Sequence, residues 1–325
     1  GYFDKASGKP FLFSETYCPS TAQNRKYCST RVWSLFRRAA PSQNFSPDYH
    51  RYVEGAEPYP LWIKPDEKLS LENVFKLMRD HYEGTPYDLT KGLSAGPYEL
   101  PYRWRPLTFK IDSVEHPDDE YGWERAISTQ QTGFSFISQS RSRLPNSIGG
   151  IQWYGVDDTY HTCYFPLYCG INDIPESYAV GSLEEFSWES AWWIFNLVSN
   201  YTGLKYSYMI EDIKAVQSEL ENYFIRFQPF IEQTALELNN QDTELLAKFL
   251  TDYSVNGGEM VVSRWKKLAE HLFTKYNDGY IKNKNGEPES KGYPQEWLKS
   301  VVDEKPEHYL LPAKRGEIPD SKLTD

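Results

Sequence analysis

Asp157, Asp158 and His161 lie close together in the sequence and have side chains that bind metal ions or transfer protons. Three donors from a single turn seldom hold a metal without a fourth ligand. The chain contains neither the HExxH motif nor cysteines at CxxC spacing. A metal site and an ordinary polar turn therefore both fit this cluster, and we expect no metal ion and no other cofactor.

Four cysteines provide thiols for nucleophilic catalysis: Cys18, Cys28, Cys163 and Cys169. A thiol needs a base, so Cys163 or Cys169 could pair with His81 or His161. The alternative is that a buried cysteine serves as a small apolar residue. His81 itself stands at the end of a predicted helix, where it could cap carbonyl groups or hold Asp80 instead of taking part in catalysis.

Arg31 is a cation at an unusual position. Ser29 can cap a short helix over residues 30–40, whose apolar side chains recur at helical spacing before Pro41. A positive side chain in the first turn opposes the helix dipole, so the position of Arg31 needs another explanation than solvation.

The stretch from residue 124 to 170 is rich in β-branched and aromatic residues in three runs: 127–139, 151–157 and 162–169. The short turns between these runs favour antiparallel neighbours and predict a β-meander. Both faces of the third run are apolar, which indicates a sheet covered on both sides. Polar side chains within the stretch must find partners or serve a site: Gln130, Gln131, Arg141, Arg143 and Asp157. We expect Gln130, Gln131 and Asp157 to hold the polar interior of the sheet.

Helices are predicted on both sides of this stretch. Ser70 can cap one before it and Asp242 can cap one after it, and from residue 187 onward the apolar period changes from 2 to 3.6. The later helices are expected to be broken at Pro229 and again at Gly257-Gly258. Their apolar stripes are interpreted as core packing and not as a cofactor site.

Composition excludes several classes of protein. A hydrophobic content of 39% and a charged content of 25% are typical of a soluble globular protein, and no apolar run approaches the roughly 18 residues of a membrane span. A net charge of -11 argues against a nucleic-acid partner. The 10 Trp, 25 Tyr and 17 Phe either line a sugar or peptide cleft or serve as core material.

Several multi-residue strings carry a resemblance to a known family: RDHYEGTP (79–86), PYRWRP (101–106), STQQTGF (128–134), LPN (144–146) and WYGVDD (153–158). In this order they resemble the dipeptidase A family of N-terminal-nucleophile cysteine hydrolases, which is distantly similar to bile salt hydrolases, penicillin V acylases and secernins. The likeness runs from about Gly1 to about Tyr223.

The resemblance implies an α+β fold, part of an αββα sandwich with an antiparallel sheet. Residues 1–180 are expected to form a portion of this sandwich, residues 181–311 a helical region, and residues 312–325 a disordered tail. The family mechanism uses a cysteine as the first mature residue, whose thiolate attacks the peptide carbonyl while its own α-amino group acts as base. The acyl-enzyme is then hydrolysed.

This sequence departs from the family pattern at its first residue. Gly1 has no thiol, and no methionine start or signal segment precedes it, so we expect that an upstream segment with the nucleophile was removed. The chain alone is then expected to be inactive, as a truncated or processed piece or a degenerate relative. The missing N-terminal segment is its expected partner.

The resemblance also suggests site residues. Arg31 matches a family motif whose arginine stands near the nucleophile, where it would favour the thiolate; a structural salt bridge is the alternative. Trp104 and Trp153 are candidates for the walls of a cleft. The expected function is hydrolysis of dipeptides or short peptides, against the alternative of a binding module for peptides or sugars without chemistry. A homo-oligomer and a cytoplasmic, periplasmic or secreted location all stay open.

Overall fold

The computed structural model describes residues 4–8, 11, 13–17, 21, 24–103, 108–112, 115, 119–289 and 291–311. It is a mixture of helices and small antiparallel sheets and divides into two compact units. Unit 1 comprises Gly1–Asp88 and Arg103–Thr132, and unit 2 comprises Leu89–Tyr102 and Gly133–Asp325. Gly1 and the predicted disordered tail 312–325 lie outside the described residues.

The described residues of unit 1 form short helices, loops and a pair of strands: η1 (Lys5–Ser7), α1 (Phe13–Tyr17), η2 (Arg25–Ser29), α3 (Thr30–Ala39), η3 (Pro41–Gln43), α4 (Leu71–Met78), β1 (Thr108–Phe109) and β2 (Tyr121–Gly122). The π-helical turn η2 runs directly into α3, so Ser29 has helical backbone angles and its side chain makes no capping bond. Ser70 caps α4 as predicted, because its side chain accepts a hydrogen bond from the backbone of Asn73.

Buried polar contacts join α3 to the loop after α4. Asp80 is fully buried, accepts a hydrogen bond of 2.5 Å from Ser34 and forms an ion pair with Arg38. Trp33 packs beside the rings of His50 and Tyr87, at centroid distances of 5.0 and 5.5 Å. These contacts hold the helix that carries Arg31.

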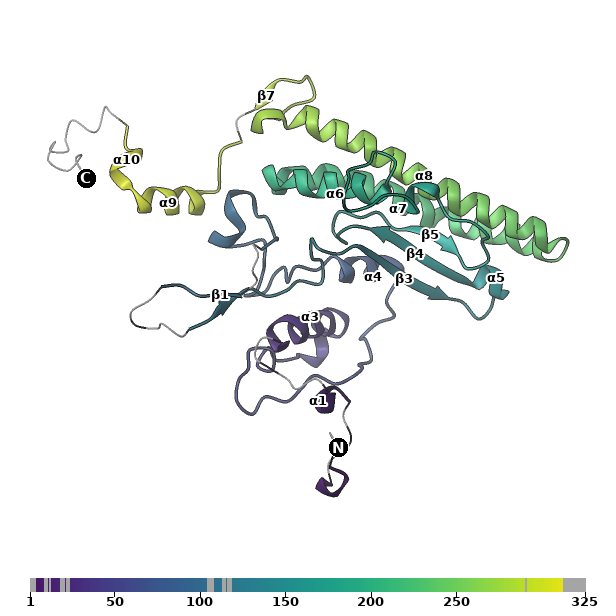
Figure 1. Ribbon diagram of the computed structural model, residues 1–325, viewed down its shortest axis with the longest axis horizontal. Helices are drawn as coiled ribbons and strands as arrows, with labels where there is room; N and C mark the ends of the chain where they lie inside the picture. The colour runs from purple at the N-terminus through teal and green to yellow at the C-terminus, as the bar shows by residue number, and fades with distance from the viewer. Residues whose placement is uncertain are drawn as a thin grey trace. The chain divides into compact units, whose positions relative to one another are not determined.

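Unit 2 contains an antiparallel sheet in the order β3-β4-β5: β3 (Phe134–Ser140), β4 (Gly150–Val156) and β5 (Phe165–Tyr168), with α5 (Asn146–Gly149) in the first connection (Figure 1). The predicted meander is confirmed. Its first strand begins at Phe134 and not at residue 127, because the backbone of Thr132 bonds to Thr129 and closes a turn. Gln131 is exposed in this turn and Gln130 is half-buried, so the prediction that Gln131 holds the interior of the sheet is wrong.

The two faces of this sheet differ. On one face Trp153 is completely buried, Tyr168 contacts the ring of Tyr253, and Gln139 bonds to Gln228. On the other face of β3, the side chains of Phe134 and Phe136 are 58% and 47% exposed. The expectation that the sheet is covered on both sides therefore holds for β5, which is buried except for the half-buried Leu167, but not for β3.

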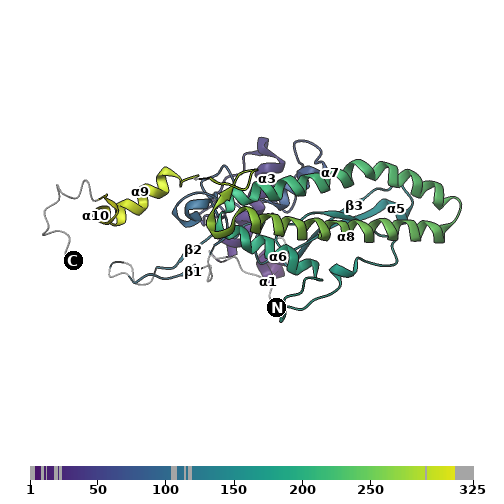
Figure 2. The same cartoon turned by 90° about the horizontal axis from the view of Figure 1, so that it is seen from above.

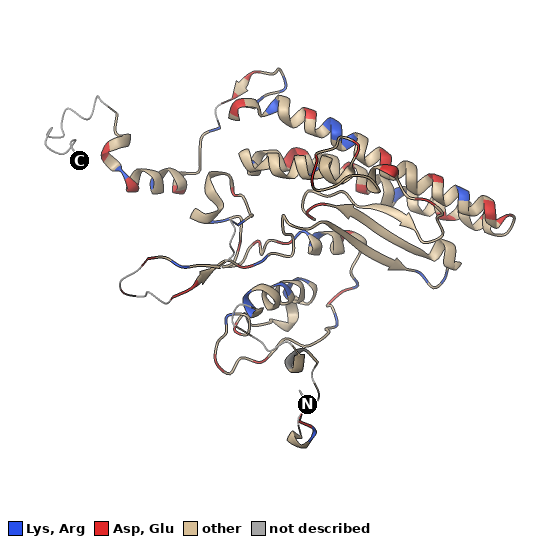
Figure 3. Cartoon of the chain, viewed as in Figure 1, with Lys and Arg blue, Asp and Glu red and all other residues tan. Residues whose placement is uncertain are grey.

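Helices cover the buried face of the sheet: α6 (Ala191–Tyr201), α7 (Tyr206–Asn239) and α8 (Thr243–Lys275), preceded by η5 (Glu176–Tyr178) and with η6 (Thr202–Leu204) between α6 and α7. Figure 2 shows α7 and α8 side by side, and both contact β5. In Figure 3 charged residues are spread along both helices, whereas the three strands have none. No described helix is long and apolar enough to cross a membrane.

The predicted breaks in these helices are absent. α7 continues through Pro229, and α8 continues through Gly257-Gly258 to Lys275. Packing of α7 on α8 outweighs the one helical hydrogen bond that proline removes. A Cβ atom at Gly258 would lie 2.4 Å from Cγ of Pro175, so this glycine permits close packing and does not end the helix. Asp242 caps α8 as predicted.

The chain after α8 forms a small hairpin and two short helices: η7 (Asn277–Gly279), β6 (Ile281–Lys282), β7 (Pro288–Glu289), α9 (Gln295–Glu304) and α10 (Pro306–Tyr309). α9 packs against η4 (Leu93–Tyr98), which belongs to the same unit. α9 thereby meets a segment that lies far earlier in the chain.

Candidate functional site

Arg31 lies on α3 in unit 1 and contacts the preceding turn. Its Nε donates to the carbonyl of Tyr27 at 3.0 Å, and its Nη2 lies 3.7 Å from Sγ of Cys28. Since η2 precedes α3, Arg31 is not at a free helix terminus, and its unusual position is explained by this local bond. Within the described ranges no carboxylate forms an ion pair with Arg31, so the alternative of a salt bridge has no partner there.

Of the two tryptophans expected to line a cleft, the structure describes Trp153 but not Trp104. Trp153 is 0% exposed on β4, and its indole nitrogen donates to Gln139 at 3.2 Å. The structure therefore places Trp153 in the core of unit 2 and not on an open surface, because a ring on this face of β4 packs under the helices. Trp104 lies outside the described residues.

A cluster of polar side chains lies just beyond the end of β4. The phenolic oxygen of Tyr102 is 2.8 Å from Oδ2 of Asp158 and 2.7 Å from Nδ1 of His161. Nδ1 of His161 is itself 2.8 Å from Oδ2 of Asp158, and both of these residues are completely buried. The cluster joins the β4–β5 connection to a segment that precedes the sheet.

Helix α6 and the turn after it supply further partners. Ser199 donates to Oδ2 of Asp158 at 2.6 Å, and Oγ1 of Thr202 lies 3.2 Å from Nε2 of His161. Burial alone would raise the pKa of the Asp158 carboxyl. The charge of His161 and the hydrogen bonds from His161, Ser199 and Tyr102 outweigh burial and hold this pKa below its usual range. Asp158 therefore remains an ionised acceptor for several donors.

The pKa of the neighbouring carboxyl group, on Asp157, is shifted in the opposite direction. Asp157 is fully buried with φ at 64°, and its Oδ1 accepts a hydrogen bond of 2.9 Å from Asn196 of α6. Its Oδ2 has no hydrogen-bond partner among the described residues. Burial, followed by the charge of Asp158, raises the pKa of Asp157 well above its usual value. Their surroundings thus shift the pKa values of these two adjacent carboxyl groups in opposite directions.

The sequence also suggested a cysteine–histidine pair and a metal site, and the contacts of His161 bear on both. Both ring nitrogens of His161 already lie against oxygen atoms, so this ring could serve a cysteine only by losing one of these contacts. Cys163 is buried, whereas Cys28 and Cys169 are exposed. In the part of the chain that the structure describes, no group of three or more His, Cys, Asp or Glu residues could hold a metal ion.

The sequence did not single out Tyr102, Ser199 or Asn196 as members of this cluster. Tyr102 belongs to the string 101–106, so its position in a shared motif was a signal, but nothing local connected it to Asp158. Ser199 and Asn196 lie on a helix whose other residues are largely apolar, and only the folded structure shows which carboxyl group each one faces.

Comparison with known proteins places these residues in a family. The family model described as Peptidase family C69 matches residues 1–219, which include α3, the sheet and the cluster around Asp158. The chain belongs to peptidase family C69. The match ends within α7, so the remainder of α7, α8 and the C-terminal hairpin follow the part that the family model describes.

Curated relatives have dipeptidase names. A probable dipeptidase of Salmonella dublin is 28% identical over 171 residues, which are 53% of this chain and 32% of that protein. A probable dipeptidase of Latilactobacillus sakei is 25% identical over 260 residues, 74% of this chain and 48% of that protein. Dipeptidase A of Lactobacillus helveticus is 22% identical over 205 residues, 63% of this chain and 35% of that protein. The chain thus spans about a third to a half of the length of these relatives.

Proposed function

We propose that the protein to which this chain belongs is a dipeptidase that hydrolyses dipeptides or short peptides with the thiolate of an N-terminal cysteine. Membership of peptidase family C69 carries this proposal, together with three relatives named dipeptidases. In this proposal the thiolate attacks the peptide carbonyl, the α-amino group of the same residue accepts the proton, and water hydrolyses the acyl-enzyme. Arg31 stands near the thiol and favours its ionised form.

The nucleophile in this proposal is not one of the residues considered above. Gly1 has no side chain. Cys18, which lies outside the described residues, and Cys28, Cys163 and Cys169 have their backbone nitrogens in peptide bonds, so none combines a thiol with a free α-amine. We therefore assign the nucleophile to a cysteine of a longer protein or a separate fragment. On this assignment the 325-residue chain is inactive by itself.

The open face of the sheet supports an αββα arrangement. Phe134 stacks on Tyr154 across the strands at a centroid distance of 6.0 Å, and the exposed rings of Phe134 and Phe136 form an apolar surface that a second sheet could cover. In this proposal residues 1–180 are one portion of the sandwich and residues 181–311 are a helical region packed on it. The dipeptide substrate then lies outside the buried cluster around Asp158.

Peptide hydrolysis by the full-length protein tests this proposal. The protein should release free amino acids from a panel of dipeptides, and replacing its first mature cysteine by alanine should abolish release while the melting temperature stays unchanged. The purified 325-residue chain should release none, and its intact mass should show whether a fragment that begins with cysteine accompanies it. If the full-length protein binds peptides or sugars but hydrolyses no dipeptide, the alternative of a binding module replaces the dipeptidase proposal.

A further inference from the structure

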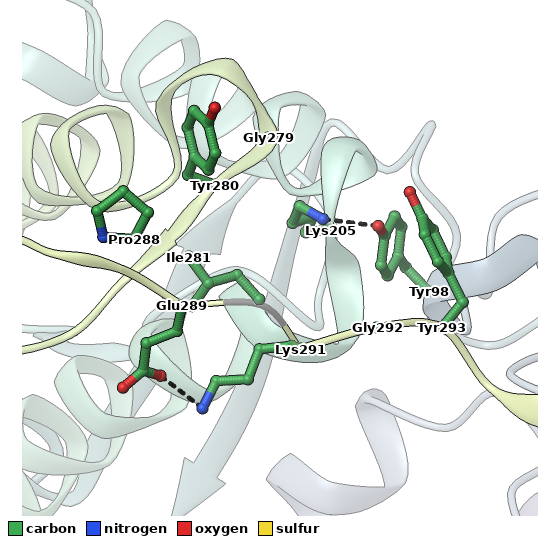
Figure 4. A pocket seen from close by; sticks show the side chains of 10 residues that line it. All are labelled: Tyr98, Lys205, Gly279, Tyr280, Ile281, Pro288, Glu289, Lys291, Gly292 and Tyr293. Atoms are coloured by element: carbon green, nitrogen blue, oxygen red, sulfur yellow. Dashed lines mark hydrogen bonds and ion pairs between the residues drawn. The ribbon is translucent and has the colours of Figure 1, made fainter.

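A pocket of about 370 Å³ lies in unit 2 where the start of α7 meets η4 and the C-terminal hairpin (Figure 4). Sites for small molecules in proteins begin at about this size. Ile281 and Pro288 of the hairpin provide apolar surface. The rings of Tyr98 and Tyr293 lie 5.5 Å apart between centroids and form an aromatic wall.

Lys205 contributes a cation without a counter-charge to this pocket. Its Nζ donates to the phenolic oxygen of Tyr98 at 2.6 Å and lies 4.3 and 5.9 Å from the ring centroids of Tyr98 and Tyr293. No carboxylate in the described part of the chain pairs with it. An ammonium group has three donors, and Tyr98 takes one of them. An anionic oxygen beside Tyr98 would complete the contacts of this half-buried lysine.

The second lysine of the pocket is already neutralised. Nζ of Lys291 lies 2.5 Å from Oε2 of Glu289, and Figure 4 shows this pair separately from the contact between Lys205 and Tyr98. The charges of these three residues leave a single positive charge. A single carboxylate group attached to an apolar body fits such a lining better than a phosphate, which carries more charge and no apolar surface.

We propose that this pocket binds small carboxylates with an apolar or aromatic side group, in particular free amino acids and dipeptides. Lys205 and the hydroxyl of Tyr98 hold the carboxylate, while Tyr293, Ile281 and Pro288 contact the side group. The choice of amino acids and dipeptides within this class of ligand rests on the proposed function, because they are its products and substrates. The carboxylate preference rests on the lining alone.

Family membership does not assign this pocket. Tyr98 and Lys205 lie within residues 1–219, which the family model matches, but the hairpin and Tyr293 follow that range. The pocket therefore requires a C-terminal segment that the family model does not describe.

Calorimetric titration of the 325-residue chain tests the proposal without any turnover. We expect L-phenylalanine and Ala-Phe to bind with dissociation constants of about 1 mM or tighter, and L-phenylalaninamide, which lacks the carboxylate, to bind at least about tenfold more weakly. Lys205→Met should weaken binding of L-phenylalanine at least about tenfold, since it removes the cation. Tyr98→Phe, which keeps the ring, should weaken it about threefold or more.

The control is Lys267→Met, which removes an exposed lysine of α8 and should leave binding unchanged. Thermal melting checks that each variant is folded. Equal affinity for the acid and the amide, unchanged binding in both pocket variants, or no saturable heat from either ligand would overturn the proposal. Displacement of L-phenylalanine by equimolar acetate would overturn the ligand class, because only a general anion site would remain. A failure of peptide hydrolysis in the full-length protein changes none of these outcomes.

Discussion

The phenolic oxygen of Tyr102 lies 2.8 Å from Oδ2 of Asp158, a carboxylate that also accepts a hydrogen bond from Ser199 and contacts His161. The bond crosses 56 positions of sequence and holds the segment before the sheet against the β4–β5 connection. Because Asp158 is fully buried and its pKa is lowered, each of its donors stabilises the ionised carboxylate. The cluster is therefore expected to contribute to stability.

Replacing Tyr102 by phenylalanine measures this contribution. Tyr102→Phe removes one donor from a buried carboxylate and should lower the free energy of unfolding by about 1–3 kcal/mol, measured by urea denaturation at pH 7. The matched control is Tyr201→Phe, because the hydroxyl of Tyr201 has no hydrogen-bond partner among the described residues and its ring stacks on Phe273. Equal effects of the two substitutions would contradict the role given to Tyr102.

Arg141 and Glu232 form a second long-range contact that stability measurements can test. The guanidinium of Arg141 pairs with Glu232 of α7 and donates to the carbonyl of Ile148 at 2.8 Å, so it joins the β3–β4 connection to α7. Both side chains are nearly buried, at 6% and 12% exposed. Arg141→Met should lower the free energy of unfolding by about 3–5 kcal/mol, because it leaves the carboxylate of Glu232 without its cation.

The double variant Arg141→Met/Glu232→Met should be more stable than Arg141→Met alone, since neither charge is then left unpaired. Lys248→Met is the control on α8, where Lys248 and Asp252 form an exposed ion pair of 2.6 Å. It should change stability by less than about 1 kcal/mol. If the double variant is less stable than the single one by the full cost of a second independent substitution, the two residues do not act as a pair.

Two glycines with different surroundings provide a test of packing. A Cβ atom at Gly258 would lie 2.4 Å from Cγ of Pro175 and 3.0 Å from Cε2 of Phe165, whereas one at Gly203 would meet nothing within 4 Å. Gly258→Ala should therefore lower the free energy of unfolding by about 1–3 kcal/mol. Gly203→Ala should change it by no more than about 1 kcal/mol and in the stabilising direction. A neutral Gly258→Ala would show that α8 can shift away from Pro175.

These cases show which features of the fold could be predicted from the sequence and which could not. The meander was predictable because its turns are short and its pairing is local, and Ser70 and Asp242 cap helices through contacts within three residues. Gly258 was misinterpreted as a helix end because its reason, the approach of Pro175, comes from a segment distant in sequence. The start of β3 was misplaced because the turn at Thr129–Thr132 begins and ends with threonine, a residue that also favours strands.

The contacts of the candidate site residues could not be predicted from the sequence, because they depend on the folded structure. The partner of Arg31 is the carbonyl of Tyr27, one turn earlier, but the sequence alone could not show the π-helical turn that puts it there. Burial of Trp153 depends on which face of β4 the helices cover, which periodicity does not determine when both faces are apolar. Lys205 and Tyr98 meet across 107 positions of sequence, and no local pattern indicates such a contact.

His50 predicts how stability depends on pH. The residue is 3% exposed, and burial, followed by the nearby charge of Arg51, lowers the pKa of His50 from 6.5 to about 4. Between these values the unfolded chain binds a proton at this position and the folded chain does not, so the free energy of unfolding should fall as pH falls from about 6.5 to about 4. Above pH 6.5 the contribution of His50 should be constant.

Urea denaturation at several pH values between 5 and 7 checks this expectation. His50→Phe retains a ring beside Trp33 and Tyr87 but cannot titrate, so its stability should depend less on pH than that of the unsubstituted chain. The control is His271→Gln, whose side chain is 56% exposed on α8. If His50→Phe and His271→Gln retain the same pH dependence as the original chain, the folded and unfolded states protonate His50 alike.

The role proposed for Arg31 is tested in the full-length protein. A cation within about 4–6 Å lowers the pKa of a thiol by about 1–3 units, so Arg31→Met should lower kcat/KM for a dipeptide at pH 7 by about tenfold or more. The rise of kcat/KM with pH should move to higher pH, because the thiol without its cation ionises later. Arg31→Lys keeps the charge and should restore part of the activity, but not the bond from Nε to Tyr27.

Arg226→Met, an exposed arginine of α7, is the control and should leave the pH profile unchanged. A merely structural Arg31 would lower the melting temperature and the amount of active enzyme, and the pH at which activity rises would stay the same. The displacement of the pH profile therefore separates the two roles even if Arg31→Met is partly unfolded. An unmoved profile in Arg31→Met, with Arg31→Lys no more active than Arg31→Met, would assign Arg31 to the packing of α3 on η2.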